Sequence, residues 1–366
     1  LHTNIPITGI TLPIGISFFT FQALSYVIDV YRGDVKVQKN PFYLGLYIAF
    51  FPQLIAGPII RYHTIAEQIE KRKMTLDRFY NGVRRFISGF AQKILLANAF
   101  SVVADEAFSC IGQPENLSIT FAWLGAICYS FQILFDFSGY SSMAIGLGKM
   151  FGFDFMENFN YPYISKSVSE FWRRWHISLR QFFRDYVYVP MGGSRVTSKF
   201  ILVRNLFVVW LLTGIWHGAS WNFIVWGLMN FVVIMISQEL EPLYMKFHAK
   251  FNVKEKKWYG AFEILRTIFL MSSLRMFDCY RDVPLTFYMF GNMFTHFRLQ
   301  YLNAEAFLGL GLTASDYLLL FICLIVLVTV SLVQERKGHV RDLIFAAPEI
   351  CRYAVFFVMV LAVIIF

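Results

Sequence analysis

The sequence predicts an all-α, polytopic membrane protein, and its composition and apolar runs are the basis of that prediction. Of the 366 residues, 57% are hydrophobic and only 16% are charged, and the mean hydropathy is +0.52. Soluble globular domains are rarely this apolar. The apolar residues occur in runs long enough to cross a ~30 Å hydrocarbon core, which takes roughly 20 helical residues. With no repeat or soluble segment between them, we expect a single membrane domain over residues 1–366.

About nine apolar runs are expected to form spanning or re-entrant helices. They centre on residues 10–30, 41–60, 86–108, 118–137, 201–217, 221–237, 259–277, 316–333 and 351–366. Because the chain begins at Leu1 and stops at Phe366 inside an apolar run, we expect a longer protein trimmed at both ends.

The basic segments between these runs orient the helices. Lys and Arg concentrate on the cytoplasmic side of membrane proteins, which places residues 61–85, 166–204, 246–257 and 335–341 there. The run 41–60 has basic flanks at both ends and contains the helix breaker Ala56-Gly57-Pro58, so we expect it to enter the membrane and return. Since the net charge of +9 is explained by these loops, nucleic acid binding is not expected. The five single cysteines indicate neither a disulfide framework nor a thiolate metal site.

Residues 165–188 predict a continuous amphipathic helix at the cytoplasmic interface. Ser167 and Glu170 have the spacing of a capping box, which starts a helix. Apolar side chains then recur every three or four residues beside a basic strip. That strip anchors the helix to anionic lipid or, with Arg174, attracts an anionic donor; its members are Arg173, Arg180 and Arg184.

Two histidines are the candidate site residues. His176 lies four residues after Trp172 and is expected to face the protein interior. His217 follows Arg204 by 13 residues, or about 20 Å of helix at 1.5 Å per residue. Because a titratable ring is costly in lipid, we interpret the pair as functional, at two depths of one tunnel. Alternatively, each ring bonds a backbone carbonyl between helices. Two histidines without a third ligand make a poor metal site, so no metal is expected.

Acyl transfer is the reaction that these residues favour. A neutral imidazole can take a proton from a hydroxyl that attacks an activated acyl group. No GxSxG nucleophile motif is present, so direct transfer with His217 as base is simpler than an acyl-enzyme. Further side chains are expected to line the tunnel: Trp172, Trp175, Trp216, Asn222 and Asp136. Asp136 is alternatively a helix-end cap beside Gly139, and the nearby Gly146 and Gly148 favour close helix packing.

Five longer stretches add a family resemblance. They are LPIGISFFTFQALSYVIDVYRG, FPQLIAGPIIRYH, FDFSGYSSMAIGLGKMFGFDFMENFNYPY, FWRRWHISLRQFFRDYVYVPMGG and TGIWHGASWNFIVWG. Together they resemble the bacterial branch of the membrane-bound O-acyltransferase (MBOAT) family, most of all its alginate and exopolysaccharide acetylation proteins. The resemblance is dense over residues 11–230, the MBOAT-like catalytic core. Residues 231–366 match only in hydropathy, as additional transmembrane helices.

The resemblance implies both a fold and an activity. The fold is a ring of transmembrane helices, with re-entrant and interfacial helices, around a central tunnel. His176 and His217 correspond to the two characteristic histidines of the family, with His217 catalytic. The donor would be acetyl-CoA with no bound cofactor, and the acceptor a secreted or cell-surface polysaccharide reached through an extracytoplasmic partner protein. The location would be the inner (plasma) membrane. Two alternatives remain: D-alanyl transfer from a carrier protein to teichoic acid, and a transporter that performs no chemistry.

Overall fold

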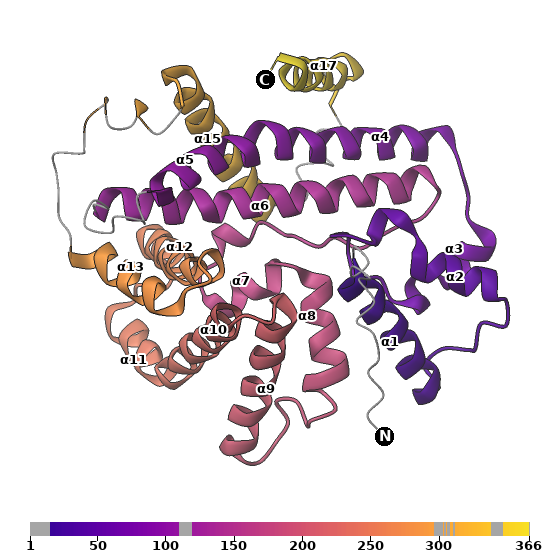
Figure 1. The fold of residues 1–366 in the computed structure, drawn as a ribbon, viewed down its shortest axis with the longest axis horizontal. Coiled ribbons are helices and arrows are strands. Elements are labelled where there is room, and N and C mark those ends of the chain that lie inside the picture. The colour runs from indigo at the N-terminus through magenta and orange to yellow at the C-terminus, as the bar shows by residue number, and fades with distance from the viewer. Residues whose placement is uncertain are drawn as a thin grey trace, which may run out of the picture.

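The computed structural model describes residues 15–109, 119–295, 303, 305, 308–309, 312–337 and 347–365. Within these ranges every regular element is helical, which confirms the predicted all-α class (Figure 1). The first elements are α1 (Ile16–Arg32), α2 (Pro41–Ala49), η1 (Phe51–Gln53), α3 (Tyr62–Lys71), α4 (Leu76–Ala91), η2 (Gln92–Ala97), α5 (Asn98–Ser109) and α6 (Ile119–Met150). Next come η5 (Pro162–Ile164), α7 (Val168–Arg174), α8 (Ile177–Phe183), η6 (Arg184–Tyr188), α9 (Lys199–His217) and α10 (Trp221–Glu239). The last are α11 (Glu241–Phe251), α12 (Lys257–Cys279), α13 (Val283–Thr295), α15 (Ala314–Lys337) and α17 (Glu349–Ile365).

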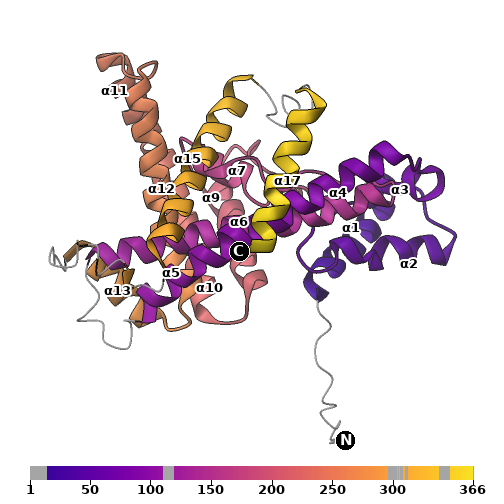
Figure 2. The same cartoon turned by 90° about the horizontal axis from the view of Figure 1, so that it is seen from above.

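Several helices have the dimensions of membrane spans, which supports a multi-pass membrane protein. In the described ranges, five helical stretches are long and apolar enough to cross a bilayer: Leu76–Phe108, Phe121–Met150, Lys199–His217, Trp221–Glu239 and Ala314–Gln334. Four of them contain one of the predicted apolar runs, and Phe121–Met150 overlaps the run 118–137. Figure 2 shows α15 and α17 crossing over the layer formed by α4 and α6, with α11 projecting at one corner of the molecule.

The other four of the nine predicted apolar runs form no helix in the described residues that is long and apolar enough to cross a bilayer. The run 41–60 forms only the nine-residue α2 and the short η1, then turns at Gly57, where a Cβ atom would lie 2.6 Å from the Gln53 Cα. This break agrees with the predicted breaker. The run 259–277 is helical as α12, but it includes Glu263, Arg266 and Arg275. The remaining two runs form α1 and α17, each with 17 residues, and the first of them begins outside the described residues.

A long helical layer forms one side of the molecule. The chain runs through α4, the π-helical η2 and α5, then returns as α6 alongside them (Figure 1). Glycines allow the close approach: a Cβ atom on Gly139 would lie 2.7 Å from the Gly89 carbonyl oxygen, and one on Gly146 would lie 2.7 Å from that of Gly82. Gly139 is therefore a packing residue inside α6, which continues to Met150. Asp136 consequently lies within the helix, and the expectation that it caps a helix end is wrong.

The predicted helix over residues 165–188 is broken. Ser167 Oγ accepts a hydrogen bond from the Glu170 amide as expected, and α7 begins there. The helix ends at Arg174, and His176 takes a left-handed backbone conformation with φ 44° before α8 starts. Periodicity alone predicted a continuous helix, because a single left-handed residue hardly disturbs the spacing of apolar side chains. The position of His176 is therefore set by this break and not by a helix face.

The α9–α10 hairpin packs against α7, α8 and α1 from the opposite side to the α4–α6 layer (Figure 1). A Cβ atom on Gly227 would lie 2.5 Å from the Trp210 carbonyl oxygen, and one on Gly214 would lie 2.6 Å from that of Phe223. These two glycines let α9 and α10 cross closely. The crossing fixes the end of α9, where His217 lies.

Candidate active site

A cleft of about 290 Å³ lies between α7, α8, η6, α9 and α10, and both candidate histidines line it. His176 comes from the break between α7 and α8, and His217 is the last residue of α9. Trp216 contacts both rings, with centroid distances of 5.9 Å to His176 and 4.8 Å to His217. Two imidazoles separated by 41 residues in the sequence are thus brought to one cavity, and one indole contacts both of them.

His217 is exposed at the end of its helix and is surrounded by aromatic rings. The ring of Trp226 meets it edge-on at 4.6 Å, and Phe223 stacks on it at 6.1 Å. The turn over residues 218–220 follows directly. The imidazole is therefore held in an apolar cage and remains accessible to a substrate in the cleft.

His176 is buried, with only 3% of its surface exposed. Phe137 meets the ring edge-on at 4.8 Å and Phe18 stacks on it at 6.3 Å. Burial lowers the pKa of His176 well below its ordinary value, and repulsion from His217 adds to the effect. At physiological pH His176 is therefore neutral, so one of its two ring nitrogens carries a lone pair.

Three arginines line the same cleft as the histidines: Arg173, Arg180 and Arg184. Burial lowers the pKa of Arg180, and repulsion from Arg184 and Arg173 lowers it further. Arg184 donates to Asp185 at 2.5 and 3.0 Å, whereas Arg173 and Arg180 have no ion pair within the described part of the chain. Arg174 is not among the residues that line the cleft, and its guanidinium is bound to Glu170 at 2.7 and 3.0 Å. The cleft therefore carries positive charge that the described residues do not fully neutralise.

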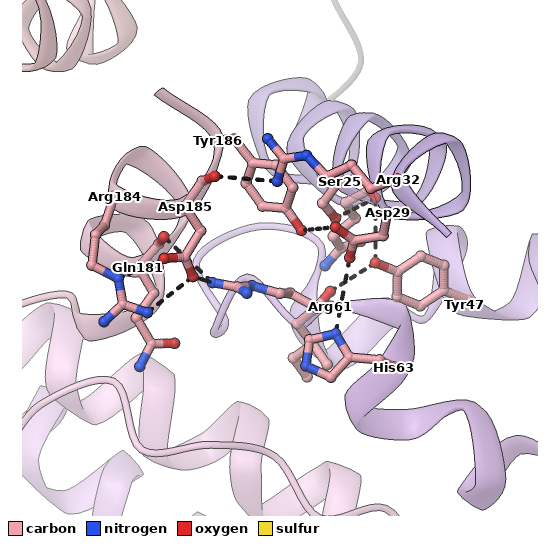
Figure 3. A network of polar contacts seen from close by, with 12 residues as sticks. Ser25, Asp29, Arg32, Tyr47, Arg61, His63, Gln181, Arg184, Asp185 and Tyr186 are labelled. Atoms are coloured by element: carbon pink, nitrogen blue, oxygen red, sulfur yellow. Dashed lines mark hydrogen bonds and ion pairs between the residues drawn. The ribbon is translucent and has the colours of Figure 1, made fainter. Parts of the chain in front are cut away.

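A polar network fixes the rim of the cleft to α1 and α3, as Figure 3 shows. Asp185 forms an ion pair with Arg61 as well as with Arg184, and these hydrogen bonds outweigh burial and hold the pKa of Asp185 below its ordinary value. Tyr186 donates to Asp29 Oδ1 at 2.7 Å. Segments that are distant in sequence are thus joined next to Arg184, which restricts the movement of this side of the cleft.

The remaining candidate residues are divided between the cleft and other parts of the fold. Trp172 and Trp175 line the cleft, and the Trp172 indole also donates to Asn230 Oδ1 at 3.1 Å. Asn222 is buried and donates to the Phe277 carbonyl at 3.1 Å, which joins α10 to α12. Asp136 forms an ion pair with Lys93 of η2. Trp216, Asn222 and Asp136 are not among the residues that line the cleft, although Trp216 contacts both histidines.

Sequence reasoning missed two polar groups beside the site. Asn158 Oδ1 lies 3.1 Å from His176 Nδ1. Arg275 lies over the Trp175 ring at 4.5 Å and is bound to Asp278 at 2.6 Å, with both charged groups buried. The sequence did contain a signal for this ion pair, because Arg275 and Asp278 are charged residues three positions apart at the end of an apolar run. Among the described residues, no group of three or more His, Cys, Asp or Glu side chains could hold a metal ion.

Comparison with known proteins identifies the family. Residues 18–281 match the MBOAT, membrane-bound O-acyltransferase family. A probable alginate O-acetylase of Azotobacter vinelandii is 50% identical over 234 residues, which cover 64% of this chain and 46% of that protein. The peptidoglycan O-acetyltransferase of Helicobacter pylori is 37% identical over 264 residues, covering 65% and 49%. The teichoic acid D-alanyltransferase of Bacillus subtilis is 31% identical over 254 residues, covering 67% and 61%.

The extent of the matches decides what they establish. The chain spans about half the length of the first two of these relatives, so their names do not fix its whole activity. The family match, in contrast, covers well over half of the chain and includes His176, His217 and the three arginines of the cleft. The chain therefore belongs to the membrane-bound O-acyltransferase family.

Proposed function

We propose that this protein transfers an acetyl group from cytosolic acetyl-CoA to a hydroxyl, as a step in O-acetylation of a cell-surface or secreted polysaccharide. The supporting observation is that two histidines and three arginines line one cleft. The relatives from Azotobacter vinelandii and Helicobacter pylori, an alginate and a peptidoglycan O-acetylating protein by name, favour a polysaccharide acceptor. We further propose that the protein lies in the inner membrane and that an extracytoplasmic acetyltransferase takes part in the transfer to the polysaccharide.

The arginines are the groups proposed to bind the donor. The phosphates of acetyl-CoA are anionic, and guanidinium groups bind phosphate through paired, charge-assisted hydrogen bonds. Arg173 and Arg180 are available for this role because neither forms an ion pair within the described ranges. The basic segment 166–204, placed on the cytoplasmic side by its charge, supports entry of the donor from that side.

His217 is proposed as the general base. In the proposed step the acceptor oxygen attacks the thioester carbonyl carbon while a neutral nitrogen of His217 takes the hydroxyl proton. The carbon–sulfur bond then breaks, and the proton is passed to the departing CoA sulfur or to solvent. The aromatic cage of Trp216, Phe223 and Trp226 favours the neutral imidazole that this step requires.

D-alanyl transfer is the second candidate, because the Bacillus subtilis relative is a teichoic acid D-alanyltransferase by name. Its donor would be a D-alanyl group carried on a protein, and the same arginines could bind the phosphate of a carrier arm. A transporter in which the histidines relay protons would perform no transfer at all. The donor that labels the product therefore separates the three possibilities.

The decisive experiment supplies radiolabelled acetyl-CoA to the purified protein and follows label in the acceptor. His217→Ala is expected to lower the transfer rate by roughly 10²- to 10⁴-fold, the usual contribution of a general base. His248→Ala is the matched control, because this histidine bonds Tyr259 and does not line the cleft. Unchanged transfer by a folded His217→Ala protein would refute the assignment. Label from a D-alanyl carrier alone would favour the second candidate, and no label from either donor would favour transport.

A further inference from the structure

Asn158 connects the loop between α6 and η5 to the break between α7 and α8, where His176 lies. Its backbone carbonyl accepts from the Ile177 amide at 2.9 Å, directly after the left-handed residue. Its side-chain oxygen has three neighbours: the Ser178 amide at 3.1 Å, the Ser178 hydroxyl at 2.9 Å and His176 Nδ1 at 3.1 Å. With only 1% of its surface exposed, Asn158 is a buried centre of hydrogen bonds around the break between α7 and α8.

The donors around Asn158 determine which way its amide faces. Oxygen and nitrogen of an amide are hard to distinguish by shape, so the orientation must follow from the partners. The Ser178 backbone N–H can only donate, and therefore the atom that faces it must be the oxygen. The Asn158 amide nitrogen is consequently turned away from Ser178, and it has no partner in the described part of the chain.

The Ser178 hydroxyl agrees with this orientation. Its oxygen accepts from the Ile59 amide at 3.0 Å, so its hydrogen is free to be given to Asn158 Oδ1 at 2.9 Å. The Ile59 amide thus donates to the Ser178 hydroxyl, and that hydroxyl donates to Asn158 Oδ1. Because Oδ1 can only accept, the fourth member, His176 Nδ1, must contribute an N–H to the same oxygen.

From this geometry we infer that Asn158 is a positioning residue that holds His176 in the Nδ1–H tautomer. Nε2 then carries the lone pair, and it has no hydrogen-bond partner among the residues that the structure describes. Since His176 lines the cleft, its open nitrogen can accept a hydrogen bond from a substrate O–H or N–H group. It cannot donate to the thioester carbonyl oxygen. This role toward the substrate rests on the proposed function, whereas the tautomer does not.

The surroundings of Asn158 explain how its amide nitrogen can be buried without a hydrogen-bond partner among the described residues. Asn158 lines a second cavity of about 290 Å³ on the α6 side, together with Gln92, Ser138 and Ser141. His176 is not among the residues that line this cavity, and Asn158 is not among those that line the cleft. The hydrogen-bonded pair therefore lies between the cleft and a second cavity that is partly lined by polar side chains and large enough to hold water, which can satisfy an amide N–H.

The test is nitrogen-15 NMR of the protein labelled only at histidine, in lipid bilayers near neutral pH. A His176→Gln variant identifies the His176 signals by their loss. In the unsubstituted protein we expect Nδ1 to resonate as a protonated nitrogen and Nε2 as an unprotonated one. A protonated Nε2 with an unprotonated Nδ1 would overturn the inference, and this comparison needs no substitution at Asn158.

Variants then test the positioning role of Asn158. Asn158→Ala removes the acceptor, so we expect both tautomers of His176 to appear, while Asn158→Asp keeps an oxygen acceptor and should restore the proton on Nδ1. Asn160→Ala is the matched control, because the Asn160 amide N–H bond to Arg174 uses backbone atoms only. An unchanged His176 signal in a folded Asn158→Ala protein would contradict the role. If the tautomer is confirmed but no acetyl transfer is found, the proposed function fails and this inference stands.

Discussion

At the scale of the single residue, the proposed binding of the acyl donor by the cleft arginines can be tested through Arg180. Burial lowers the pKa of Arg180, and repulsion from Arg184 and Arg173 lowers it further. An anionic phosphate placed there would relieve this repulsion, and such an interaction operates in the bound donor as well as in the transition state. Substitution should therefore raise KM much more than it lowers kcat.

We predict that Arg180→Gln raises the KM for acetyl-CoA about tenfold, the equivalent of about 1.4 kcal/mol. Steady-state kinetics at increasing salt should show the KM of the unsubstituted protein rising towards that of the variant, since ions screen exposed charges. Arg195→Gln changes the net charge equally, but Arg195 is exposed outside the cleft and should leave KM unchanged. A fall in kcat at constant KM would instead indicate a role of Arg180 in the chemical step.

The residue scale also shows what the sequence could reveal about the site. His176, His217 and the basic strip were predictable, because ionisable groups stand out in an apolar sequence. Asn158 was not predictable: an amide in a loop has no periodicity, and its contact with His176 depends on the left-handed turn. The sequence therefore indicated the groups that carry charge or can titrate and missed the neutral group that orients one of them.

At the scale of elements, small residues set the distances between helices. The crossing of α9 and α10 is close because Gly227 faces the backbone of α9 at Trp210. A methyl group there must push the two helices apart, and His217 at the end of α9 would move with them. Such overpacking typically costs about 1–3 kcal/mol.

We predict that Gly227→Ala lowers both the melting temperature and the acetyl transfer rate. Gly291→Ala is the control: this glycine lies inside α13 with no atom within 4 Å of an added Cβ, so alanine should leave stability unchanged or raise it slightly. Thermal unfolding in detergent, followed by circular dichroism, compares the two variants. Equal melting temperatures would contradict the close crossing of α9 and α10.

Helices could be predicted where residues within one segment determine them. Hydropathy located the long helices α6, α9 and α10, and the glycines of α6 correctly indicated close packing. The length of α6 was underestimated because the sequence alone does not distinguish a glycine inside a helix from a glycine at its end. The distinction depends on which helix packs against that glycine. The break at His176 is fixed by hydrogen bonds from residues 158–160, and contacts between segments leave no trace in the periodicity of either one.

At the scale of the whole molecule, the charge pattern predicts how the protein is oriented in the membrane. The loop before α9 and the loop between α11 and α12 are basic, whereas the turn over residues 218–220 carries no charge. The positive-inside rule places the first two in the cytoplasm. Because α9 and α10 each have the length of a span, the turn that joins them should face the opposite side.

Single cysteines at exposed positions test this orientation, in a background with the native cysteines replaced by serine. We predict that Ala219→Cys reacts with a membrane-impermeant maleimide in intact spheroplasts, because it lies in the turn after His217. Arg195→Cys and Lys254→Cys, both exposed in basic segments, should react only after the membrane is permeabilised. The reverse pattern would mean that the cleft arginines face away from the cytosol, and a cytosolic acyl donor could then not reach them by the proposed route.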